Sequence, residues 1–122
     1  MESKTRFVQD RTFSMTFTDA NATADINPIP FAVDRILFKF LGCNHNNSAT
    51  LMLQSDLIYF NTIAIFQANV SANVAPINNE FVFQTPQKIG GRYNFQIKDI
   101  AGALANTING SEITVVAQFI RD

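Results

Sequence analysis

The segment Arg92-Tyr93-Asn94-Phe95-Gln96-Ile97-Lys98 gives the clearest indication of the fold of this chain. Tyr93, Phe95 and Ile97 lie on one face of an extended strand, and the four polar residues lie on the other face. A period of two predicts a β-sheet with one buried face and one face in water. Because the same pattern recurs along the chain, the sequence predicts sheets that pack against each other.

Seven further segments have alternating or β-favouring residues and are expected to be strands or short strand-like pieces. They are, in chain order, 12–18, 32–41, 50–54, 56–60, 62–66, 80–84 and 112–120. In the second of these, the alternation predicts that Ile36, Phe38 and Phe40 face the core. In the last, every second residue from Ile113 to Phe119 is expected to face inward.

The segments between these strands determine the predicted topology. Residues 19–30 and 67–79 are rich in Asn, Ala and Pro and are predicted to be surface crossings, whereas 103–108 is expected to form one helical turn. Long crossings between short strands favour Greek-key or jelly-roll sandwiches over an up-and-down barrel. The sequence therefore predicts an all-β fold, a single jelly-roll or Greek-key β-sandwich of about eight strands over residues 1–122. Residues 1–11 are either an N-terminal arm or the first edge strand.

Composition limits the class of protein. A chain of 122 residues is expected to form one domain, and its 16% of charged residues is below the roughly 25% of typical soluble domains. Such sparse charge is expected either of an assembly subunit with covered faces or of a surface built from Asn, Thr, Gln and Ser. A net charge of −1 without a basic stripe predicts no direct contact with nucleic acid. No secretory signal and no apolar run of about 18 residues is present, so we expect synthesis in the cytosol and no membrane span.

The chemically reactive residues form no recognisable catalytic or metal-binding motif. His45 lies among three Asn residues in a predicted turn and has no partners at ligand spacing, so we expect a loop histidine and no metal or other cofactor. The chain has no nucleophile elbow, and its carboxylates are scattered. Cys43, at the end of a predicted strand, is expected to be a buried, inert thiol. The sequence thus predicts a protein without enzymatic activity.

Two parts of the chain resemble a known family. They are Val33–Lys39 followed by Leu53–Ile58, and Gly91–Gly102 followed by Val115–Ile120. Together they resemble the small jelly-roll capsid proteins, pentons or minor capsid proteins, of large icosahedral double-stranded DNA viruses. Thr85-Pro86 with Gly91-Arg92-Tyr93-Asn94-Phe95 is also similar to the C1q and tumour-necrosis-factor jelly rolls, which are usually secreted trimers.

The first resemblance implies a structural virion protein, made in the host cytoplasm, that contacts other capsid proteins including a major capsid protein and forms a homo-oligomer. For its interface we single out Arg6, Phe7 and Arg11 in the N-terminal segment, and Phe31 as an anchor of the first crossing. The alternative function is a β-sandwich binding module, lectin-like or similar to C1q and tumour necrosis factor, that acts in ligand or receptor attachment. For that function the polar loop 44–48 is the candidate site.

Overall fold

The eight strands pair in a nested order: the first with the last, the second with the seventh, the third with the sixth and the fourth with the fifth. The computed structural model describes residues 6–43, 49–68, 73–104 and 112–122. The strands are β1 (Phe7–Thr16), β2 (Asn21–Ile26), β3 (Val33–Cys43), β4 (Ala49–Ser55), β5 (Asn61–Ala68), β6 (Asn73–Gln87), β7 (Gly91–Asp99) and β8 (Glu112–Arg121), with a 3-10 turn η1 (Asp56–Ile58) between β4 and β5.

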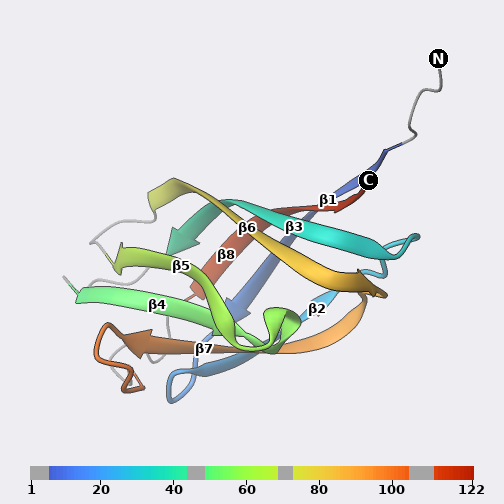
Figure 1. Ribbon diagram of the computed structural model, residues 1–122. Helices are drawn as coiled ribbons and strands as arrows, with labels where there is room; N and C mark the ends of the chain where they lie inside the picture. Colours follow the sequence, from blue (N-terminus) through green and yellow to red (C-terminus); the bar gives the residue numbers. More distant parts are fainter. Residues whose placement is uncertain (1–5, 44–48, 69–72, 105–111) are drawn as a thin grey trace.

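Nested pairing generates two antiparallel sheets. One has the order β1-β8-β3-β6 and the other β2-β7-β4-β5, so successive nested pairs alternate between the sheets. The additional pairings of β3 with β8 and of β4 with β7 join the pairs within each sheet. This is a long hairpin rolled into a sandwich (Figure 1), which is the jelly-roll arrangement. The predicted all-β jelly-roll sandwich of about eight strands is confirmed.

The core lies between the two sheets and follows the predicted alternation. In β8 the side chains of Ile113, Val115, Ala117 and Phe119 are fully buried. In β7 Phe95 is also fully buried, and its ring lies 5.7 Å from that of Phe13 on β1 in the opposite sheet. Because apolar side chains lost from water supply most of the driving force for folding, this layer fixes how the sheets face each other.

The prediction that Phe40 faces the core is wrong. Phe40 is 40% exposed, and the neighbouring Leu41 is buried instead. The register of β3 against both of its neighbours shifts between Phe38 and Phe40, so a β-bulge at Lys39 reverses the alternation from that point on.

The two predicted crossings are also wrong in large part, because each contains a strand. Within 19–30 the chain forms β2, whose inward face carries small alanines and one isoleucine and so gives a weak hydrophobic signal. Within 67–79 the chain enters β6 at Asn73. That strand contains Pro76 and Pro86, which are tolerated because β6 is at the edge of its sheet.

The remaining predictions concern two short segments, two turns and the N-terminal segment. Residues 56–58 form η1 rather than a strand, and β5 covers the expected 62–66. The Asp99 turn closes with the amide of Gly102 donating to the Asp99 carbonyl at 3.0 Å. Most of the expected helical turn at 103–108 lies outside the described residues. Residues 7–11 belong to β1, and residues 1–5 lie outside the described part of the chain.

Two further observations concern the described residues alone. They contain no helix that is long and apolar enough to cross a membrane. In the same part of the chain, no three His, Cys, Asp or Glu side chains gather where they could hold a metal ion. Cys43 is buried, as predicted, whereas His45 lies outside the described residues.

Candidate interaction surfaces

The first candidate surface is an aromatic corner formed by Phe7 and Phe31. Phe7 begins β1, an edge strand, and Phe31 lies in the connection between β2 and β3. Their ring centroids are 5.6 Å apart, although 24 positions separate them in the sequence. Phe7 is 48% exposed and Phe31 is half-buried. The fold therefore joins two of the four predicted interface residues into one partly apolar surface.

Arg6, the third predicted interface residue, belongs to a charged network next to this corner. Its Nε lies 3.5 Å from Oδ1 of Asp122, whose Oδ2 accepts a hydrogen bond of 3.1 Å from Nε of Arg35. Nη1 of Arg35 also donates to Oε2 of Glu80 at 2.8 Å. The hydrogen bond to Glu80, followed by that to Asp122, raises the pKa of Arg35 above its usual value, so this guanidinium stays charged. The network connects the start of β1 and the C-terminal end, which lie side by side (Figure 1), to β3 and β6.

Arg11, the fourth predicted interface residue, contacts its own chain. Its Nε and Nη2 donate to the carbonyl oxygens of Asn27 and Pro28, at 3.3 and 3.2 Å, and Nη1 donates to the carbonyl of Asp10 at 3.0 Å. The carbonyls of Asn27 and Pro28 follow the end of β2, so Arg11 holds the β2–β3 connection against β1. A contact of Arg11 with another subunit stays a prediction.

The turn after η1 presents two aromatic side chains that the sequence pattern did not single out. The amide of Tyr59 donates to the carbonyl of Asp56, and that of Phe60 donates to the carbonyl of Ser55 at 2.7 Å, which together form a Schellman motif. Tyr59 and Phe60 both have left-handed backbone conformations, with φ of 58° and 59°. Glycine is the usual residue in such a conformation, and a residue with a Cβ costs about 1–2 kcal/mol there. The chain therefore places two large rings at positions that disfavour them.

The two rings have different surroundings. The Tyr59 ring centroid lies 6.0 Å from that of Phe81 and 6.1 Å from that of Phe83, both on β6, and the last two rings are 5.2 Å apart. Tyr59 is 64% exposed whereas Phe83 is buried, so this three-ring cluster is open to solvent on its Tyr59 side. Phe60 makes no ring contact with the described residues and is 45% exposed.

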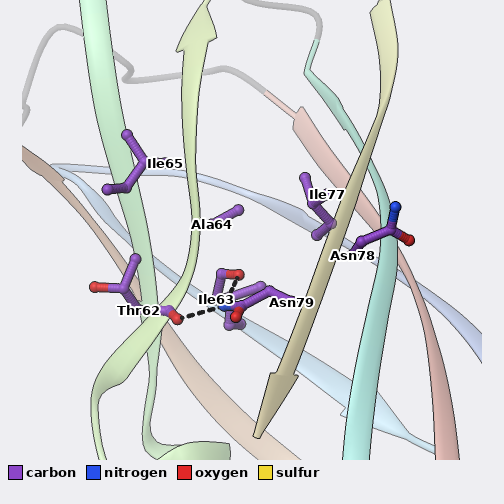
Figure 2. A pocket seen from close by; sticks show the side chains of 7 residues that line it. All are labelled: Thr62, Ile63, Ala64, Ile65, Ile77, Asn78 and Asn79. Atoms are coloured by element: carbon purple, nitrogen blue, oxygen red, sulfur yellow. Dashed lines mark hydrogen bonds between the residues drawn. The ribbon is translucent and has the colours of Figure 1, made fainter.

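A third surface is the seam between β5 and β6, the edge strands of the two sheets. Figure 2 shows Asn79 of β6 reaching across to β5, where its Nδ2 donates to the carbonyl oxygens of Thr62 at 3.1 Å and Ile63 at 2.7 Å. A register shift beside Ile63 places the two consecutive carbonyls within reach of one amide. The hollow here measures about 460 Å³, and Ile65 at its rim is exposed. One side chain thus connects the two sheets where no backbone ladder does.

Sequence reasoning missed Tyr59, Phe60 and Asn79 for an identifiable reason. Tyr59 and Phe60 are β-favouring aromatic residues within the predicted strand-like piece 56–60. Asn79 lies within 67–79, which was predicted to be a surface crossing. The polar loop 44–48, the candidate site of the alternative binding function, lies outside the described residues.

Comparisons with known proteins give distant likenesses. The sequence matches no protein-family model and no curated protein. Among solved structures, the fold is similar to a chain of the infectious bursal disease virus Gx strain, with 11% identity and a TM-score of 0.46 over 97% of this chain and 32% of that one. It is also similar to the infectious bursal disease virus VP2 subviral particle, with 13% identity and a TM-score of 0.42 over 94% of this chain and 32% of that one. A third structure, described as CBM4 structure and function, has 10% identity and a TM-score of 0.32 over 91% of this chain and 78% of that one. This chain spans about a third of the length of the two viral chains, and at these scores no residue role transfers to it.

Proposed function

We propose that this chain is a structural subunit of a virus particle, a minor capsid or penton protein that binds other capsid proteins, including a major capsid protein, and assembles with copies of itself. The observation that carries the proposal is the aromatic corner of Phe7 and Phe31 at the start of an edge strand of a jelly roll. Jelly rolls occur in both capsid and lectin domains, so the strand order by itself supports a capsid role only by analogy. The corner adds a surface suited to contact with another subunit.

The chemistry of the corner fits a subunit contact. Phe7 is exposed at the start of β1, next to the network of Arg6, Arg35 and Asp122. An apolar patch with a charged rim is the common anatomy of a protein–protein interface, in which aromatic and arginine side chains are enriched. The pairing of β1 with β8 continues over ten successive residues without a register shift, so β1 is held along its whole length.

Cross-linking mass spectrometry of purified virions tests the proposal. We expect the chain in the particle fraction, with cross-links to a major capsid protein and between copies of the chain. A virus that carries Phe7→Ser should incorporate roughly tenfold less of the chain, because truncation of an aromatic anchor that becomes buried in a subunit interface costs more than about 1 kcal/mol.

Ile100→Ser is the matched control, because Ile100 is also exposed but lies in the turn after β7, outside the corner. This variant should be incorporated like the wild type. Recovery of the chain only from host fractions would overturn the proposed function. Equal incorporation of Phe7→Ser and wild type would remove the corner as its interface.

A further inference from the structure

A hollow of about 510 Å³ lies on the outer face of the sheet β2-β7-β4-β5 and is lined entirely by uncharged side chains. Its volume is within the usual range for small-molecule sites. The pairing of β2 with β7 places Asn21 opposite Gln96 and Thr23 opposite Asn94. We call these four polar side chains the floor of the hollow. Phe60 is the aromatic residue in the lining.

The turn that carries Phe60 is fastened to this floor. Oδ1 of Asp56 accepts from the backbone amide of Asn94 at 2.9 Å, and Oδ2 accepts from its side-chain Nδ2 at 3.2 Å. The fully buried Ser55 donates through Oγ to the carbonyl of Asn94 at 2.8 Å. Three hydrogen bonds to one residue of β7 therefore set the position of the turn relative to the floor of the hollow.

The backbone conformation of Phe60 is a second feature of the site, separate from the shape of the hollow. Its left-handed backbone is unfavourable for any residue with a Cβ, and Phe60 is 45% exposed without a ring partner among the described residues. Backbone preference therefore does not explain a phenylalanine here. Strained residues of this kind gather at binding and active sites, where the surrounding structure imposes the conformation.

The polar floor has hydrogen-bonding capacity to spare. Among the described residues, the side chains of Thr23 and Gln96 make no hydrogen bond, and Asn21 uses only its Nδ2, which donates to the carbonyl of Asp19. Hydroxyl and amide groups both donate and accept hydrogen bonds. The site therefore offers one apolar ring beside groups of both hydrogen-bonding kinds, with no formal charge.

We propose that this hollow binds a neutral saccharide, with the C–H face of a sugar ring on Phe60 and its hydroxyl groups on Thr23 and Gln96. A sugar ring has an apolar face and hydroxyls that donate and accept, which matches the lining. A phosphate, a nucleic-acid backbone or a sialic acid would need a cation, and the lining itself contains none, although Lys98 and Arg92, which is paired with Asp25, lie on the same face of β7. This inference does not depend on the proposed capsid function, and it places the site on a sheet face rather than in the loop 44–48.

A glycan array that carries neutral and sialylated oligosaccharides, probed with the full chain, tests this inference. The strongest neutral glycan is then titrated by NMR. We expect neutral glycans to bind. Phe60→Gly should weaken binding at least roughly tenfold, and Gln96→Ala about threefold to tenfold, since each removes one contact from a small interface.

Tyr59→Gly is the matched control. Tyr59 shares the turn and the left-handed conformation, but its ring packs on Phe81 and Phe83 instead. This variant should bind the glycan like the wild type, and thermal melts of all three variants would show that they are folded. If Phe60→Gly does not fold, Gln96→Ala alone decides. The inference is overturned if no neutral glycan binds at millimolar concentration, if only charged glycans bind, if Tyr59→Gly weakens binding as much as Phe60→Gly, or if Gln96→Ala binds like the wild type.

Discussion

Asn79→Ala tests how the two sheets are connected at the β5–β6 seam (Figure 2). The substitution removes the Nδ2 that donates to the carbonyl oxygens of Thr62 and Ile63. The Asn79 amide is the donor that both carbonyls share. The side chain of Asn79 is half-buried, so water replaces the lost donor only in part.

The magnitude follows from these contacts. An intramolecular hydrogen bond contributes about 0.5–1.5 kcal/mol net, and a partly buried acceptor left without its donor costs up to about 3 kcal/mol. Because Asn79→Ala removes one donor that two acceptors share, we expect it to lower the free energy of unfolding by about 2 kcal/mol. For a chain of this size that corresponds to a decrease in Tm of roughly 5–10 °C.

Asn79→Asp sharpens the test through pH. The new carboxylate would face two carbonyl oxygens, which disfavours its charged form and raises its folded-state pKa above the unfolded value of about 3.9. Protonation is then favoured in the folded state, so the variant is most stable below about pH 3.9 and loses stability as the pH rises through the raised pKa. The neutral acid can also donate to one carbonyl. We expect this variant to be less stable than Asn79→Ala at pH 7 and at least as stable at pH 3.5.

Urea denaturation of both variants and of wild type at the two pH values measures these differences, because other carboxylates titrate equally in all three. Gln84→Ala, an exposed change on the same strand without a described hydrogen bond, is the control and should match wild type within about 0.5 kcal/mol. The reasoning is refuted if Asn79→Ala is as stable as Gln84→Ala, or if the stability of Asn79→Asp relative to Asn79→Ala does not change with pH.

Two further predictions concern the backbone. Gly90→Ala would place a Cβ 2.8 Å from Cα of Pro28 and should cost about 1–3 kcal/mol in urea denaturation, whereas stability equal to wild type would show that the two loops separate easily. Leu41→Ala should cost about 2–5 kcal/mol, because Leu41 is buried, while Phe40→Ala should cost clearly less because Phe40 is 40% exposed. The reverse order of these two losses would contradict the bulge at Lys39.

Local sequence patterns were sufficient to predict the fold class and the inward faces of the most regular strands. Alternation is a local property: a side chain on a pleated strand points away from its neighbours whatever the rest of the chain does. For that reason the inward residues of β7 and β8 were predicted correctly from 92–98 and 112–120. Turn chemistry is similarly local, as the bond between Asp99 and Gly102 shows.

The bulges, the edge strands and the surfaces depend on contacts between segments that are distant in the sequence, so local patterns could not predict them. The position of a bulge depends on the register of the neighbouring strands. No pattern within 32–41 could therefore show that Leu41 would replace Phe40 in the core. The strands β2 and β6 are held mainly by hydrogen bonds to one neighbour, which allows alanine, asparagine and proline where a central strand would require larger apolar residues. The contacts of Phe7 with Phe31 and of Asn79 with Thr62 and Ile63 arise because nested pairing brings distant segments together.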